Sequence, residues 1–145
     1  MSKIIAFDIG DKRIGVAVSD PFGNMALPLE TYFRKNFAAD IAALCDLAKK
    51  NYAEIIVCGL PLNVDGTFSE QTEKTLSFIE ELKKRTDLPV ETQDERFSTK
   101  EAHRVLISEN MRREKRKNHV DSVAASFILD DYMRRKANEK VANKK

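Results

Sequence analysis

The sequence holds few of the residues from which many metal and redox centres are built. Its 145 residues include no Trp, two Cys and two His. Cys45 and Cys58 form no CxxC pair, and together with His103 and His119 they show none of the spacings typical of zinc ligands. This excludes a zinc-bound domain of the usual kinds, and we expect both thiols to lie in an apolar core.

Long apolar runs are absent as well. No stretch approaches the roughly 20 apolar residues that span a membrane, and the first residues show no signal-peptide pattern. Apolar residues make up 42% and charged residues 33% of the chain, which is typical of a globular domain. We therefore expect one domain over residues 1–136, followed by a basic, flexible tail over 137–145, in the cytoplasm and away from membranes.

Neither sign of charge is in large excess, since the net charge is only +2, but the charges are unevenly distributed. Residues 112–145 hold eleven Lys/Arg against five Asp/Glu, whereas the preceding residues hold fourteen basic and eighteen acidic side chains. This imbalance indicates an anionic partner near the C-terminal quarter. The run MRREKRKNH is predicted to be a basic loop that leads into the last helix, while the final residues alone are also consistent with a solvated tail.

The pattern of short apolar runs predicts a mixed sheet. Five stretches favour strands: 3–9, 14–19, 24–32, 54–58 and 89–93. The short connections between the first three predict antiparallel neighbours, and Pro28 places the third at an edge of the sheet. The later strands are separated by helices and should run parallel to the first, which gives an α/β fold with a five-stranded mixed sheet flanked by helices.

Helices are predicted over 36–50, 67–85, 98–108 and 118–135. Their first turns carry the capping residues Asn36, Thr67 with Glu70, Ser98 with Glu101, and Asn118.

Acidic residues follow two of the predicted strands, and a third acid lies in the last helix. Asp8 closes the first strand, Asp94 and Glu95 close the fifth, and ligands collect beyond the carboxyl ends of parallel strands. A carboxylate at the end of an apolar strand is costly to bury without compensation, and Mg²⁺ bound by one or two carboxylates supplies that compensation.

Each acid also has a purely structural interpretation. Asp8 could accept backbone hydrogen bonds in the turn that follows it, and Glu95 could belong to a surface ion pair with Arg96. Asp121 lies three residues after Asn118, where an acid favours the free N–H groups of a helix start.

Four motifs resemble the RuvX family, also called YqgF. They are IAFDIGDKRIGVAVSD, GLPLNVDGT, DERFST and KRKNHVDSVAASFIL, in this order and over about residues 3–133. The resemblance implies a ribonuclease-H-like fold similar to that of Holliday-junction resolvases, and a metal-dependent nuclease domain. In bacteria the family is associated with maturation of the 5′ end of pre-16S ribosomal RNA.

Carried over position by position, the resemblance implies that Asp8, Glu95 and Asp121 are catalytic and hold one or two Mg²⁺ or Mn²⁺ ions, with Asp94 as an additional candidate. Resolvase-type relatives carry an acid at the end of the fourth strand, where this chain has Gly59-Leu60-Pro61, so Glu95 would have to take that place. This departure leaves open whether one ion binds or two. His119 is either a proton carrier or an exposed residue at a helix start.

Basic residues around these acids indicate a path for phosphates. The candidates are Lys12, Arg13, Arg96, Arg112, Arg113, Lys115, Arg116 and Lys117. Such contacts do not read bases and make binding strongly dependent on salt. The loop with Asn63, Asp65 and Gly66 is a candidate substrate contact or simply a turn and cap.

The expected partner is nucleic acid, either pre-rRNA within ribosome precursors or a branched molecule, and the chain could be a monomer or a homodimer. A resolvase-like DNase and a non-catalytic RNA-binding module of ribosome assembly remain alternatives. The first motif also resembles the phosphate-binding hairpin of sugar kinases and actin-like ATPases, but those enclose a nucleotide between two lobes, and no GxxxxGK[ST] loop is present.

Overall fold

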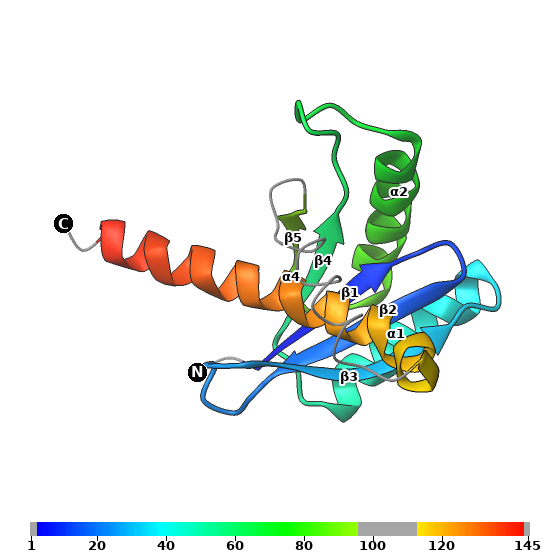
Figure 1. The fold of residues 1–145 in the computed structure, drawn as a ribbon, viewed down its shortest axis with the longest axis horizontal. Helices are drawn as coiled ribbons and strands as arrows, with labels where there is room; N and C mark the ends of the chain where they lie inside the picture. Colours follow the sequence, from blue (N-terminus) through cyan, green and yellow to red (C-terminus); the bar gives the residue numbers. More distant parts are fainter. Residues whose placement is uncertain (1–2, 96–112, 144–145) are drawn as a thin grey trace.

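The computed structural model describes the backbone of residues 3–95 and 113–143, and the side chains of residues 3–95 and 121–139. Its strands are β1 (Ile4–Ile9), β2 (Arg13–Ser19), β3 (Ala26–Phe33), β4 (Ile55–Leu60) and β5 (Val90–Asp94). Its described helices are α1 (Phe37–Lys50), α2 (Glu70–Arg85) and α4 (Arg113–Asn143). Figure 1 shows the strands as one sheet, with α4 lying across one face and α1 and α2 on the other side.

The sheet has the order β3-β2-β1-β4-β5. β1 pairs antiparallel with β2, and β2 with β3, while β1–β4 and β4–β5 are parallel pairs. The predicted mixed sheet is therefore confirmed. Pro28 lies in the edge strand β3, as expected, and the β2–β3 register shifts between Val16 and Ala17.

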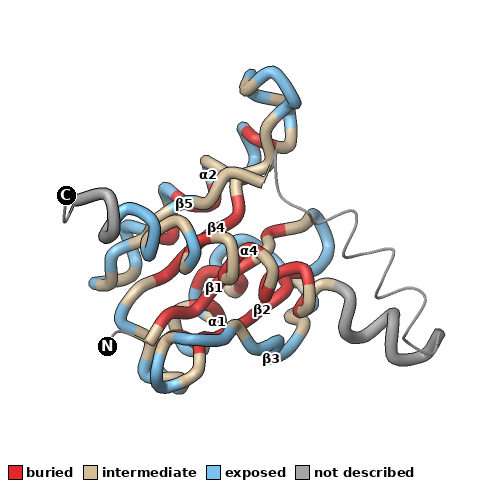
Figure 2. Tube along the Cα trace, turned by 60° about the vertical axis from the view of Figure 1, so that its left-hand side comes forward, coloured by how far each residue is buried: buried red, intermediate tan, exposed pale blue. Residues whose placement is uncertain are grey.

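The strands separate two cores by simple alternation, because successive side chains of a strand point to opposite faces. Ile5, Phe7 and Ile9 of β1 pack with α1 and α2, whereas Ile4 and Ala6 pack with α4. Buried residues lie in these central strands, on the sheet-facing sides of α1 and α2, and in the middle of α4; Figure 2 shows them in red.

The cysteine prediction is confirmed for one residue only. Cys58 in β4 is fully buried, and burial raises the pKa of its thiol to about 12. Cys45 on α1 is partly exposed, because it lies at the margin of the core where its Sγ reaches the Arg85 carbonyl at 3.9 Å.

The start of α1 was predicted correctly and the start of α2 was not. Asn36 caps α1, and its side chain accepts from the Ala39 amide at 2.9 Å. α2 begins at Glu70 with Ser69 as its cap, and Ser69 forms a capping box with Thr72. The predicted cap, Thr67, instead donates its hydroxyl to Asp65 at 2.6 Å within the preceding turn, so it is not available to cap the helix.

The C-terminal quarter differs most from the prediction. Residues 113–117 are not a loop but the start of α4, so Asn118 does not cap a helix and Asp121 does not occupy a third helical position. The stretch 113–143 contains neither Gly nor Pro and is rich in Arg, Lys and Ala, which are strong helix formers. The helix also continues past residue 135, to Asn143. The helix predicted over 98–108 lies outside the described residues.

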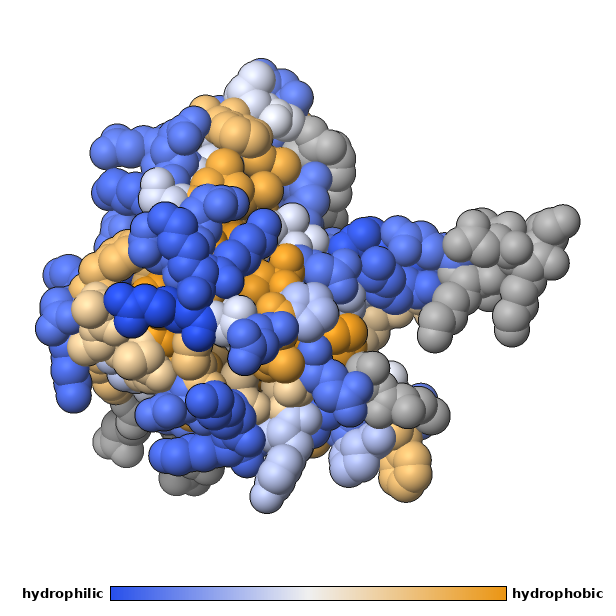
Figure 3. Space-filling model, turned by 180° about the vertical axis from the view of Figure 1, so that it is seen from behind, coloured by the Kyte–Doolittle hydropathy of each residue, from blue (hydrophilic) through white to orange (hydrophobic). Residues whose placement is uncertain are grey.

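The last turns of α4 extend away from the body of the molecule, and up to residue 139 their side chains are mostly hydrophilic, as Figure 3 shows. Although α4 has 31 residues, neither it nor another helix in the described part of the chain is apolar enough over a sufficient length to cross a membrane.

Candidate active site

Strand alternation directs Asp8 toward α4. It follows Ile4 and Ala6 at a spacing of two along β1, and both of those residues pack against α4. Its Cα partner across the β1–β2 pair is Gly15. Asp8 is therefore part of β1 itself, on the helix-covered face, rather than a residue of the turn that follows.

Gly15 lets α4 rest directly on the sheet. A Cβ atom built on Gly15 would lie 1.8 Å from the backbone oxygen of Asp121, far inside van der Waals contact. Only glycine permits this approach of helix backbone to strand backbone. Because Gly15 is the partner of Asp8, the contact brings Asp121 of α4 to the end of the sheet where Asp8 lies.

Glu95 lies at the same end of the sheet as Asp8, just after the edge strand β5. It directly follows β5, and its amide donates to the Leu60 carbonyl at 3.1 Å, which extends the β4–β5 ladder by one residue. A Cβ on Gly59 would lie 2.8 Å from Glu95 Cδ and 2.6 Å from Ile128 Cδ1. Gly59 thus leaves room for the side chain of Glu95 above β4.

The three acids line one cavity of about 310 Å³. Its full lining is Asp8, Ile9, Gly10, Asp11, Arg13, Pro61, Gln71, Glu95 and Asp121. Asp94 is not among these residues. It directly precedes Glu95, and successive side chains of a strand point to opposite faces, so Asp94 is directed away from the face of Glu95. Sequence reasoning did not single out Pro61, Gln71 or Asp11 as site residues: Asp11 and Pro61 lie within two of the motifs, but Gln71 on α2 lies in none of them.

Arg13 is the basic residue that the structure places at the acids. Its Nε lies 3.2 Å from Asp121 Oδ2, with about half of the Arg13 side chain and a quarter of the Asp121 side chain exposed. Arg13 and Gly15 are two residues apart on β2, so their positions face the same side of the sheet. Because Gly15 faces α4, the Arg13 side chain is directed toward α4 as well. Lys12, the adjacent candidate, does not line the cavity.

Arg34 stabilises the hairpin turn before Arg13 by donating two hydrogen bonds to it. Gly10 donates to the Arg13 carbonyl at 2.9 Å, and the Arg34 amide donates to the Lys12 carbonyl at 2.9 Å. The Arg34 guanidinium donates a further bond from Nη1 to the Gly10 carbonyl at 2.8 Å. Gly10 does not adopt positive φ; its role is to allow this close turn, since a Cβ there would lie 2.8 Å from the Arg13 oxygen.

Buried Asp40 fixes Arg34 in turn. Its carboxylate accepts from Arg34 Nε at 2.8 Å, from the Tyr32 hydroxyl at 3.0 Å and from the Lys35 amide at 2.9 Å. Burial alone would raise the pKa of Asp40, but these hydrogen bonds outweigh it, so the pKa lies below its ordinary value. Sequence reasoning does not predict this network, because an acid in the first turn of a helix is ordinarily explained by the helix dipole.

The loop with Asn63, Asp65 and Gly66 makes its own hydrogen bonds. The Asn63 amide donates to the Thr67 carbonyl at 3.0 Å, Asp65 accepts from the Thr67 amide at 3.0 Å, and Gly66 has a φ of 87°. None of the three lines the cavity that holds the acids. A substrate contact by this loop stays a prediction.

The remaining basic candidates are only partly described. Arg113, Lys115, Arg116 and Lys117 lie in the first turns of α4, as does His119, and Arg96 and Arg112 fall outside the described residues. Their predicted contacts with phosphates stay predictions.

The donor set partly fits a divalent cation. Asp8, Glu95 and Asp121 offer the carboxylate oxygens that Mg²⁺ and Mn²⁺ prefer, and all three line one cavity. Within the part of the chain described by the structure, however, no three His, Cys, Asp or Glu side chains lie close enough together to hold one ion. The carboxylate oxygens are donors of the type that these ions prefer. For all three acids to share one ion, however, their side chains would have to move closer to one another.

A five-stranded sheet of this order and pairing, with acids at the carboxyl ends of its parallel strands and on the helix that crosses one face, defines the ribonuclease-H-like class. RuvC of T. thermophilus in complex with a Holliday junction substrate has this fold: it is 13% identical, covers 92% of this chain and 96% of its own, and gives a TM-score of 0.59. The fowlpox virus Holliday junction resolvase is 20% identical over 91% of this chain and 98% of its own, with a TM-score of 0.55.

The family follows from closer relatives. Residues 2–135 match the family described as "RuvX: Holliday junction resolvase". A protein of Clostridium novyi named "Putative pre-16S rRNA nuclease" is 43% identical over 131 residues, which are 90% of this chain and 97% of that protein. The chain therefore belongs to the RuvX family and is a nuclease of the resolvase type.

Proposed function

We propose that this chain hydrolyses phosphodiester bonds with the help of a divalent cation, and that its substrate is the 5′ end of pre-16S rRNA in ribosome precursors of the cytoplasm. One observation carries the chemical part of the proposal: acids from β1, from the end of β5 and from α4 line a single cavity beside Arg13. The name of the Clostridium novyi relative supports the choice of RNA.

The three acids and Arg13 of the cavity each have a defined task in this proposal. Asp8, Glu95 and Asp121 would hold Mg²⁺ or Mn²⁺, which when bound supplies Lewis-acid assistance and lowers the pKa of a coordinated water. Arg13, half exposed and paired with Asp121, can donate to a phosphate oxygen as well as to the carboxylate. Gly15 and Gly59 keep the acids of α4 and β5 at the cavity by leaving space for them.

The test is cleavage of an RNA that carries the pre-16S 5′ extension, in Mg²⁺, by the wild type and by Asp8→Asn. We expect Asp8→Asn to lower the cleavage rate on the order of a hundredfold or more. Asp46→Asn is the matched control, because it makes the same chemical change on an exposed position of α1. Equal cleavage by wild type and Asp8→Asn would overturn catalysis at this cavity.

A second readout does not depend on turnover. Mn²⁺ should raise the melting temperature of the wild type and raise that of Asp8→Asn less, since a bound ion stabilises only the folded state. Binding of the RNA without cleavage or ion dependence would identify a non-catalytic RNA-binding module. Cleavage of branched DNA but not of the RNA would identify a resolvase-like DNase.

A further inference from the structure

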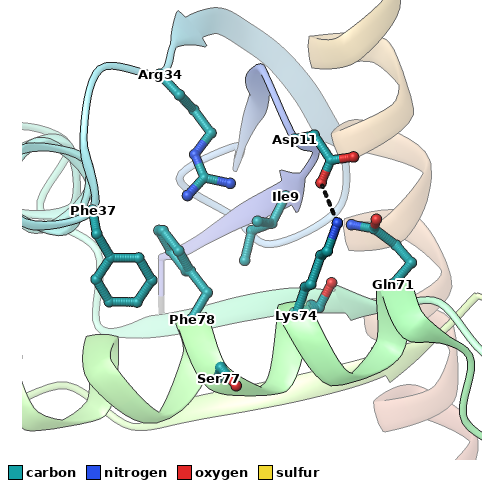
Figure 4. A pocket seen from close by; sticks show the side chains of 9 residues that line it. Ile9, Asp11, Arg34, Phe37, Gln71, Lys74, Ser77 and Phe78 are labelled. Carbon is teal, nitrogen blue, oxygen red and sulfur yellow. Dashed lines mark ion pairs between the residues drawn. The ribbon is translucent and has the colours of Figure 1, made fainter.

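A second cavity lies next to the first, on the other side of the β1–β2 hairpin. It measures about 290 Å³ and is lined by Ile9, Asp11, Arg34, Phe37, Gln71, Lys74, Thr75, Ser77 and Phe78. Ile9, Asp11 and Gln71 line both cavities, so the two are contiguous. Figure 4 shows that its walls come from the hairpin, from the segment around Arg34 and Phe37, and from α2.

One wall of this cavity is made of flat groups. The rings of Phe37 and Phe78 meet edge to face with centroids 5.5 Å apart, and Arg34 Cζ lies 5.1 Å from the centroid of Phe78. Phe78 is buried, whereas Phe37 is 45% exposed and Arg34 remains partly accessible. The bonds from Arg34 to Asp40 and Gly10 hold its guanidinium in place. Aromatic rings and guanidinium planes are the groups on which unpaired bases stack.

Another wall offers polar groups and a positive charge. Thr75 is 1% exposed, and its Oγ1 is the buried side-chain oxygen that lacks a hydrogen-bond partner among the described residues. Gln71 and Ser77 add further polar atoms, and Lys74 Nζ lies 4.0 Å from Asp11 Oδ1 at the boundary with the first cavity.

We propose that this second cavity receives one unpaired nucleobase of the strand whose phosphate lies at Asp8, Glu95 and Asp121. The base stacks on the wall formed by Phe37 and Arg34. The inference rests on the proposed nuclease function, because it needs a nucleic-acid strand in the first cavity.

This placement specifies the kind of strand that the site accepts. A base inserted between α2 and the hairpin has its edge turned toward protein and cannot be paired at the same time. The nucleotide adjoining the reacting phosphate must therefore be unpaired, as in a single-stranded end, and a continuous duplex would have to release that base first.

The experiment uses a single-stranded RNA of about twelve nucleotides, within the site size of single-strand binders, with 2-aminopurine at one position at a time. Its binding to full-length Asp8→Asn protein is followed by fluorescence, so cleavage does not interfere. We expect the fluorescence to fall on binding at one position, where the base stacks, and an abasic nucleotide there to weaken binding about five- to a hundredfold.

Two variants in the same background identify the cavity. Phe37→Ala should abolish the fluorescence change and the abasic penalty at that position, while Phe22→Ala, which removes a Phe that is 66% exposed at another site, should leave both intact.

The possible failures are distinct. If the RNA binds but no position shows a fluorescence change that depends on Phe37, the base subsite is wrong and the proposed function is unaffected. If the RNA does not bind to Asp8→Asn or to the wild type, the proposed function fails first, and the inference fails with it.

Discussion

The two faces of the sheet use side chains of different size. Toward α1 and α2 the strands present residues such as Phe7 and Ile14, which pack with Leu82 and other apolar side chains. Toward α4 they present Ala6, Ala17, Gly15 and Gly59. Large side chains fill space between layers, whereas small ones let a helix approach the strand backbone. The face with less apolar bulk is therefore the one on which acids from three elements meet.

On the same face, side-chain hydrogen bonds attach the later turns of α4 to the edge strand β5. The Tyr132 hydroxyl donates to Glu91 Oε2 at 2.5 Å, and Arg135 Nε donates to Gln93 Oε1 at 3.0 Å. The hydrogen bond from Tyr132 lowers the pKa of Glu91, and burial together with Glu91 raises that of Tyr132. Both acceptors lie on β5, on the face that also directs Glu95 to the cavity.

Gly15→Ala should break the α4 face most strongly. The new methyl group would meet the backbone oxygen of Asp121 at 1.8 Å, and backbone cannot rotate away as a side chain can. We expect a loss of more than about 3 kcal/mol in the free energy of unfolding, measured by urea denaturation, and loss of nuclease activity even in the fraction that stays folded. Activity per folded molecule equal to wild type would contradict the role assigned to this contact.

Leu82→Ala is the matching change on the opposite face. Leu82 is fully buried against the strands, so its truncation leaves a cavity and should cost about 3 kcal/mol. Because no acid depends on this side chain, cleavage per folded molecule should stay within about twofold of the wild type, an effect of less than 1 kcal/mol on the barrier. A much larger fall would show that the two faces are not functionally separate.

Asp40→Asn should have the smallest effect, and one that depends on pH. The folded-state pKa of Asp40 is below its ordinary value of about 4, so its charge stabilises the fold above that pH, and the contribution is lost as the pH falls toward the folded-state pKa. The difference in unfolding free energy between wild type and variant should be about 2 kcal/mol near neutral pH and shrink below pH ~4. A difference that stays constant down to acid pH would contradict this assignment.

Sequence reasoning succeeded where a local pattern determines the structure. The alternating strands around Asp8, the edge position of Pro28 and the cap at Asn36 are all of this kind. It failed at residues 113–117, where the basic run predicts a loop although the same residues form the start of α4. That error also produced the mistaken assignment of Asp121 to a helix start.

The candidate site was only partly accessible to such reasoning. Asp8, Glu95 and Asp121 could be chosen because each follows a strand or lies in a recognisable motif. The roles of Gly15 and Gly59 depend on which helix crosses above them, and the grouping of Phe37 with Arg34 depends on how α1 and α2 pack. None of these contacts is encoded by a spacing along the chain, so they required coordinates.

At Gly59 the strand β4 presents only backbone, and this determines which neighbouring elements can supply an acid there. Because β4 contributes no side chain at that point, the volume above it is open to whichever neighbour can extend a carboxylate into it, and here a residue at the sheet margin does so. A set of acids of this type is specified by locations in space rather than by a fixed strand for each acid. Two chains can therefore present equivalent oxygen atoms while their acidic residues stand at different points in the sequence.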